Sequence, residues 1–85
     1  MLTNNKTTVL IVEDDTFLSN IYKTKFEMEG FDVMTADDGE AGLAMAKSKK
    51  PQIILLDILL PKMDGFAVLK ELKMDKEAQN IPVIL

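Results

Sequence analysis

The chain has 85 residues, with 10 basic and 14 acidic side chains, a net charge of −4, and Lys as its only base. Because it contains no Arg, His, Cys or Trp, it has no Cys or His nucleophile, no thiolate or imidazole zinc site and no disulfide. The acidic balance argues against nucleic acid as a partner of this domain, since such binding depends on basic groups along the phosphates.

The N-terminal half predicts a strand, a helix and a second strand, in that order. Residues 1–7 are polar overall and predict a flexible lead to a single domain within residues 1–85. Thr8 to Val12 is a β-branched run typical of a strand, and Thr16 to Glu29 has apolar residues at helical spacing. Phe31 to Ala36 alternates apolar and polar residues, which predicts a strand at an exposed edge.

The C-terminal half repeats this alternation of strand and helix. Asp37 or Asp38 can cap a second helix. Later segments predict a third strand, a third helix and a fourth strand: Ile53 to Leu56, Phe66 to Met74, and Ile81 to Leu85. Strands that alternate with helices at this spacing predict an α/β fold with a doubly wound parallel sheet in the order 2-1-3-4.

Acidic residues follow the ends of the first three predicted strands. They are Glu13, Asp14, Asp15, Asp37, Asp38 and Asp57. The other eight of the 14 acids are fewer than the 10 lysines, so the chain without these six would carry a net positive charge. The six acids therefore account for the whole net negative charge of the chain. Because all strands of a parallel sheet end at one edge, we expect the six to lie where open α/β folds bind their ligands.

Asp14 and Asp57 follow neighbouring predicted strands and should therefore lie close together. Two carboxylates about 4 Å apart repel by roughly 4 kcal/mol at an effective dielectric near 20, which favours a shared proton or a bound cation. With oxygen ligands only, Mg²⁺ fits best, while Ca²⁺ and Mn²⁺ remain alternatives. Asp57 also interrupts an apolar run with no Lys adjoining it, where an unpaired charge is costly. Taken alone, Asp37 and Asp38 are more typical of a helix cap and a turn.

Two motifs resemble the receiver domain of two-component response regulators. One is VLIVEDD at residues 9–15, before a predicted helix, and the other is ILLDILLPKMDG at residues 54–65. Their order, spacing and strand context make the match specific, although either motif alone is weak. The resemblance extends from about Thr8 to Leu85 and implies a flavodoxin-like fold.

The resemblance also implies roles for individual residues. Asp57 would be the phosphoacceptor, Asp14 a direct ligand of Mg²⁺, and Glu13 a ligand acting through water. The backbone carbonyl of Leu59 would complete the protein ligands. The phosphoryl group would come from a sensor histidine kinase or a phosphotransfer protein.

The loop between Asp57 and the third helix contains four further residues with expected roles. By the same resemblance, Pro61 and Gly65 would shape this loop. Asp64 is expected to cap the helix rather than to bind metal. Lys62 is expected to be a solvated loop lysine, although it could touch phosphate.

Receiver domains continue beyond the fourth strand with a hydroxyl residue, a fourth helix, a fifth strand bearing a Lys, and a fifth helix. We therefore expect this chain to be a truncated receiver that lacks helix 4, strand 5 and helix 5, and to be phosphorylated inefficiently. The apolar segment Ile81 to Leu85 would be an uncovered edge, which predicts a homo-oligomer that pairs through the fourth strand.

Two other functional classes compete with a signalling module. A self-assembling structural βα fragment without phosphotransfer is the main alternative, and phosphorylation from a small donor discriminates the two. An aspartate phosphatase fits less well, because such enzymes resemble Asp-x-Asp where this chain has Asp57 and Leu59, so we expect no enzyme. No membrane-length apolar run and no signal peptide are found, which predicts the cytoplasm and no membrane partner.

Overall fold

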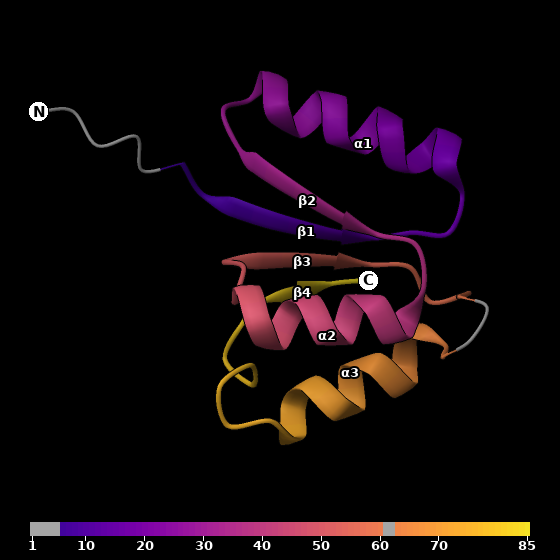
Figure 1. Ribbon diagram of the computed structural model, residues 1–85, viewed down its shortest axis with the longest axis vertical. Helices are drawn as coiled ribbons and strands as arrows, with labels where there is room; N and C mark the ends of the chain where they lie inside the picture. Colours follow the sequence, from indigo (N-terminus) through magenta and orange to yellow (C-terminus); the bar gives the residue numbers. More distant parts are fainter. Residues whose placement is uncertain (1–5, 61–62) are drawn as a thin grey trace, which may run out of the picture.

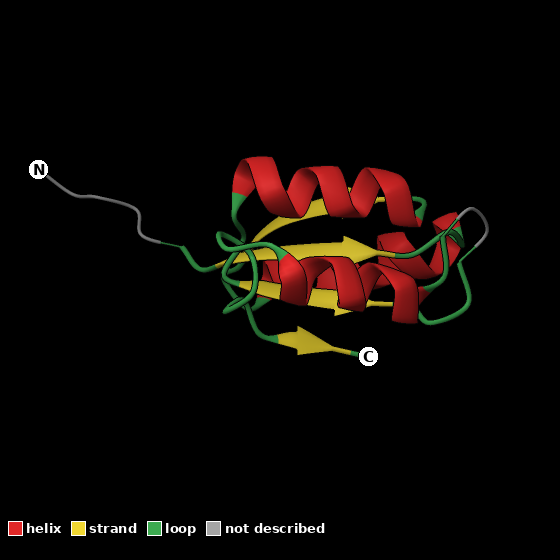
Figure 2. Ribbon diagram, turned by 90° about the horizontal axis from the view of Figure 1, so that it is seen from below, coloured by secondary structure: helices red, strands yellow, loops and turns green. Residues whose placement is uncertain are grey.

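The computed structural model describes residues 6–60 and 63–85. Within them the elements follow one another as predicted (Figure 1): β1 Thr8–Val12, α1 Thr16–Met28, β2 Asp32–Ala36, α2 Gly39–Lys49, β3 Ile53–Leu56, α3 Gly65–Met74 and β4 Val83–Ile84. The strands form one parallel sheet in the order β2-β1-β3-β4, which confirms the predicted topology. This is the arrangement of a flavodoxin-like fold, and Figure 2 shows β4 at the sheet edge beside the C-terminus.

Each helix is preceded by an aspartate whose side chain accepts hydrogen bonds from backbone N–H groups of the first turn. Asp15 precedes α1, Asp38 precedes α2 and Asp64 precedes α3, and all three have extended backbone angles. This geometry satisfies amides that a helix N-terminus leaves without partners. The structure therefore selects Asp38 over Asp37 as the cap of α2 and confirms the capping role expected for Asp64.

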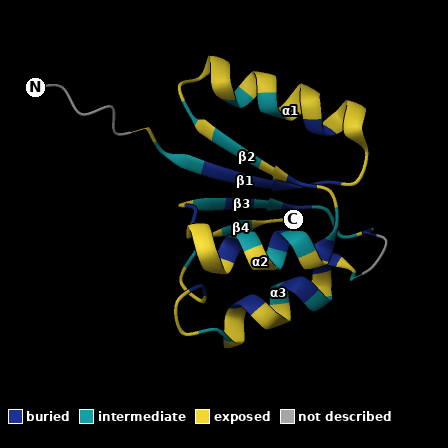
Figure 3. Cartoon of the chain, viewed as in Figure 1, coloured by how far each residue is buried: buried dark blue, intermediate teal, exposed yellow. Residues whose placement is uncertain are grey.

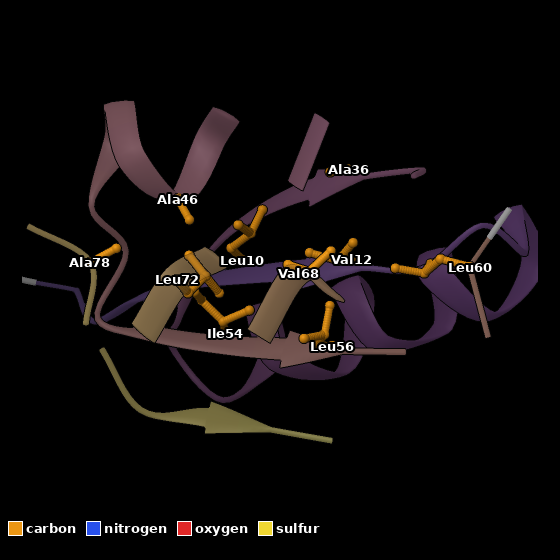
Figure 4. Close-up of a cluster of buried hydrophobic side chains, with 10 residues drawn as sticks. All are labelled: Leu10, Val12, Ala36, Ala46, Ile54, Leu56, Leu60, Val68, Leu72 and Ala78. Atoms are coloured by element: carbon orange, nitrogen blue, oxygen red, sulfur yellow. The ribbon is translucent and has the colours of Figure 1, made fainter. Parts of the chain in front are cut away.

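The larger part of the core lies between the sheet and the two helices α2 and α3. Alternate side chains of β1 and β3 face these helices, as expected for strands that are apolar at every position. The buried cluster is labelled in Figure 4 and consists of Leu10, Val12, Ala36, Ala46, Ile54, Leu56, Leu60, Val68, Leu72 and Ala78.

The opposite face of the sheet carries α1, which leaves much apolar surface uncovered (Figure 3). The helical periodicity of α1 is confirmed, yet Phe17 is 73% exposed and Met28 80% exposed. Only Ser19 of this helix is buried. The reason is coverage: within the described residues α1 packs against β1 and β2, and no second helix lies beside it over β3 and β4.

The fourth strand is shorter than predicted. It spans Val83–Ile84 rather than Ile81 to Leu85. The amide of Ile81 donates to the carbonyl of Ala78 at 3.0 Å in a turn, and Pro82 has no amide to offer a ladder. Ile84 and Leu85 are 55% and 54% exposed, so this edge is apolar and open to solvent.

None of the helices in residues 6–60 and 63–85 has the length and apolar character needed to cross a bilayer. Part of the expected N-terminal lead, residues 1–5, lies outside the described residues, as do Pro61 and Lys62. Thr7 already contributes to the sheet, because its carbonyl accepts the Asp32 amide at 2.9 Å.

Candidate functional site

Main-chain hydrogen bonds bring the ends of β1 and β3 together. Val12 and Leu56 are register partners, and the Asp57 amide donates to the Val12 carbonyl at 3.0 Å. On the other side of β1, the Glu13 amide donates to the Ala36 carbonyl at 3.0 Å. Both acids are therefore held by the ladder one residue beyond their strands, and both lie at the carboxyl edge of the sheet.

Three carboxylates meet at this edge. One oxygen from each of Glu13, Asp14 and Asp57 lies within 4.8 Å of the others. Glu13 is 9% exposed, Asp57 is half-buried and Asp14 is exposed. None of the ion pairs found among the described residues involves these three side chains. The negative charges are thus concentrated without a described basic partner.

The donor set suits a small divalent cation. Ligand oxygens around Mg²⁺ lie about 2.1 Å from the ion, which places them about 3 to 4 Å from one another in an octahedron. The oxygens of Glu13, Asp14 and Asp57 lie within 4.8 Å of one another, which is close to that spacing, and a ligand that acted through water would tolerate a longer separation. These three residues therefore fit the ion chemically.

The other three acids of the predicted edge do not join the cluster. Asp15 turns back to cap α1, accepting from Phe17 and Leu18 amides at 2.9 and 3.2 Å. Asp38 caps α2 through a 2.8 Å bond from the Ala41 amide. Asp37 instead lines a separate polar hollow that it shares with Glu13. Local capping geometry thus separates three helix or turn aspartates from the three converging carboxylates.

The carboxylate of Asp57 is oriented by the loop that follows it. The Leu59 amide donates to Asp57 Oδ1 at 3.2 Å, and the Gly65 amide donates to the Ile58 carbonyl at 2.8 Å. A Cβ at Gly65 would lie 2.5 Å from the main-chain oxygen of Asp57. Only glycine permits so close an approach, so the sequence-based expectation that Gly65 shapes this loop has a steric reason here.

Burial raises the pKa of the Glu13 carboxyl above its usual value. The neighbouring Asp57 raises this pKa further by its charge and by a side-chain hydrogen bond, and the charge of Asp14 adds to the effect. The Asp15 amide, which donates to Glu13 Oε2 at 3.1 Å, acts in the opposite direction. In the metal-free protein, folding therefore works against the charged form of Glu13.

Replacing Glu13 with Gln is expected to stabilise the metal-free protein. Charges about 5 Å apart repel by roughly 1 to 3 kcal/mol, so we expect a gain of about 1 kcal/mol at neutral pH and a melting temperature higher by about 4 to 8 °C. Because the folded pKa of Glu13 is raised, the wild type loses stability as pH rises through it. Thermal melts in chelator should therefore show an advantage of Glu13→Gln that grows from about pH 4 to about pH 7.

The matched control is Glu71→Gln, a change at an exposed glutamate of α3. This variant should follow the wild type at every pH, since Glu71 lies outside the cluster. An advantage of Glu13→Gln that is constant with pH would contradict the explanation by a raised pKa.

The cluster opens into a hollow on the α1 face of the sheet. Its volume is about 340 Å³, and Glu13 and Asp57 form its acidic end. Apolar residues of β1, β3 and the C-terminal segment form most of the rest, together with Tyr22 of α1. Sequence reasoning assigned Tyr22 only to a helix face. Its spacing of seven residues from the cap Asp15 is the signal that places the two residues on one face of α1, about two turns apart.

Comparisons with known proteins agree with this fold. The model of the response regulator receiver domain family matches residues 9–85. The DNA-binding dual master transcriptional regulator RpaA of Synechocystis sp. is 42% identical over 77 residues, which cover 91% of this chain and 32% of that protein. This chain spans about a third of the length of the first curated relatives it matches.

Solved structures give the same result at the level of fold. The N-terminal domain of a response regulator receiver protein from Methanoculleus marisnigri JR1 superposes with a TM-score of 0.86 at 34% identity, covering 89% of this chain and 62% of that one. The receiver domain of a sensor histidine kinase from Pseudomonas aeruginosa PAO1 has a TM-score of 0.89 at 23% identity, covering 92% and 64%. That crystal structure holds a magnesium ion in its active site cleft.

The family match, the sheet order and the relatives all point to one conclusion. Receiver domains are the signalling modules of two-component systems. This chain belongs to the response regulator receiver domain family.

Proposed function

We propose that this chain accepts a phosphoryl group on Asp57 from the phosphohistidine of a sensor kinase or phosphotransfer protein, with Mg²⁺ as cofactor. The observation that supports it most directly is the convergence of Glu13, Asp14 and Asp57 at the end of β1 and β3. Such a cluster is unfavourable by itself and becomes favourable when a cation is bound. Family membership supplies the reaction class.

Each acid has a separate task in this proposal. Asp14 would bind the ion directly, Glu13 would bind it through water, and the Leu59 carbonyl would add a neutral ligand. When bound, the ion would supply positive charge that offsets repulsion between the carboxylates and the charge of incoming phosphoryl oxygens. Asp57 is the nucleophile, since its half-buried carboxylate is oriented by the Leu59 amide at 3.2 Å.

The reaction is a phosphoryl transfer between two residues. An oxygen of the Asp57 carboxylate attacks phosphorus and forms an acyl phosphate. The bond between phosphorus and the donor imidazole breaks, and its electron pair stays on the imidazole nitrogen, which is protonated afterwards. No base is needed to activate an ionised carboxylate.

The test is phosphorylation of the 85-residue chain by acetyl phosphate, with and without Mg²⁺. We expect slow formation of a single adduct that requires Mg²⁺ and that peptide mass spectrometry locates at Asp57. Amide shifts during the Mg²⁺ titration should change first at residues 12–15 and 57–60. Modification that is independent of Mg²⁺, or located elsewhere, would contradict the proposal.

The open edge at β4 supports a second property, self-association with another copy of this chain. A two-fold axis through a sheet edge pairs the two edge strands antiparallel. The acidic carboxyl edge of one copy then lies beside the amino edge of the other. There, lysines at the ends of α2 and α3 outnumber acids: Lys47, Lys49, Lys50, Lys73 and Lys76 against Asp75 and Glu77. The open strand edge and the distribution of charge therefore both favour this arrangement.

Self-association without phosphorylation is the alternative to a signalling function. If the chain assembles but is never phosphorylated, it is a structural βα module with an acidic edge. The acetyl phosphate experiment discriminates the two. For the signalling function we propose the cytoplasm as the compartment, with no membrane or nucleic acid contacted by this domain.

A further inference from the structure

The first residue of α2 lies directly on the loop that follows Asp57. A Cβ at Gly39 would collide with the main-chain oxygen of Met63, and would lie 2.9 Å from Met63 Cβ and 2.9 Å from Val68 Cγ2. Real Cβ atoms do not approach other atoms so closely, so the missing side chain is what permits this contact. The first residue of α2 therefore packs directly against Met63, near the end of the loop that leads to α3.

The near end of the same loop is held by the other close glycine contact. A Cβ at Gly65 would lie 2.6 Å from Ile58 Cα, next to Asp57. The Leu59 amide, in this part of the loop, donates to Asp57 Oδ1. The described ends of the connection from β3 to α3 are thus fixed by two glycines, and Gly39 comes from an element that contributes no acid to the cluster.

We propose that Gly39 is a positioning residue for the phosphoacceptor Asp57. It sets where Met63 lies against α2, and through the chain that joins β3 to α3 it sets the Leu59 amide and carbonyl around the carboxylate. The chemical part of this inference rests on the proposed function, whereas its structural part does not.

A side chain at position 39 must displace something, and the loop is the part that yields. The first turn of α2 is held by the Asp38 cap and by close packing of Gly42 on Val12. On the other side, Val68 of α3 is 1% exposed and lies in the core. Met63, in contrast, is only partly buried against the core and belongs to no helix or strand. A Cβ on Gly39 is therefore expected to move Met63 rather than either helix.

Gly42 offers a matched control one turn along the same helix. A Cβ there would lie 2.7 Å from Val12 Cγ2, inside the core and away from the loop. Both glycine-to-alanine changes should lower thermal stability, since both force atoms apart. Only Gly39→Ala should shift the Leu59 amide, because the atoms nearest to a Cβ at Gly42 belong to Val12 and not to the loop.

The experiment compares wild type, Gly39→Ala and Gly42→Ala in two steps. Without metal, amide spectra should show the Leu59 amide shifted in Gly39→Ala and unshifted in Gly42→Ala. With Mg²⁺ and acetyl phosphate, Gly39→Ala should lose about tenfold in ion affinity and in phosphorylation rate, the size expected for a supporting partner, and Gly42→Ala should stay within about twofold.

Equal effects of the two changes, or an unshifted Leu59 amide in Gly39→Ala, would overturn the inference. If the wild type is never phosphorylated, the proposed function fails, and the metal-free spectra still decide the positioning role. If Gly39→Ala does not fold, Asp38→Ala replaces it, because it loosens the first turn of α2 without adding atoms. The Leu59 amide should then exchange with solvent faster than in the wild type, and an unchanged exchange rate would again overturn the inference.

Discussion

Replacing Asp57 with Asn is expected to abolish phosphoryl acceptance and, in the absence of metal, to raise stability by about 1 kcal/mol. The amide has nearly the same shape and can still accept the Leu59 N–H, but it is no nucleophile. The gain in stability follows from removing one of three charges whose oxygens lie within 4.8 Å of one another. Intact-mass analysis after acetyl phosphate treatment and thermal melts in chelator measure the two effects.

The matched control for this variant is Asp64→Asn, in the same loop. Asp64 caps α3 by accepting the Ala67 amide at 2.9 Å, and Asn is an equally good cap. The control should therefore keep both the fold and the adduct. An adduct on Asp57→Asn, or its loss from Asp64→Asn, would show that the acceptor has been misassigned.

The fold was predictable because the pattern of apolar residues indicates whether each strand lies in the interior of the sheet or at its edge. β1 and β3 are apolar at every position, as interior strands of a doubly wound sheet are. Asp32 and Thr35 mark β2 as an edge, and both are exposed. The position of the acids that follow β1 and β3 could then be predicted from strand order alone, because these neighbouring strands end at the same edge of the sheet. The convergence of Asp14 and Asp57 needed no further information.

Other features depend on geometry that a sequence pattern does not contain. Six acids follow the first three strands, yet only three converge, because Asp15 caps α1 while Asp14, one residue earlier, joins the cluster. The periodicity of α1 predicted an apolar face but not how little of it would be covered. The contact of Gly39 with Met63 is likewise a tertiary contact, and the sequence shows only a glycine after a cap.

Self-association through β4 is expected to make unfolding depend on protein concentration. In the described residues β4 pairs only with β3, and Ile84 and Leu85 are about half exposed beside the apolar hollow. An open apolar edge binds a second strand readily, and burying it stabilises the folded chain by mass action. The melting temperature should therefore rise as the concentration increases from micromolar to millimolar, while light scattering reports a mass above that of the monomer.

Ile84→Asn should weaken this association at least about tenfold, or about 1.4 kcal/mol, because it places an amide in the buried centre of the contact. Met28→Asn is the control, since Met28 is 80% exposed at the C-terminal end of α1, a helix that packs mainly on β1 and β2. It removes a comparable apolar side chain and should leave the association unchanged. A wild-type chain that stays a folded monomer at millimolar concentration would refute the interface, and so would an Ile84→Asn variant that associates as tightly as the wild type.

The antiparallel arrangement also predicts a dependence on salt. Raising the salt concentration should weaken association, because it screens the acidic edge of one copy from the lysines of the other.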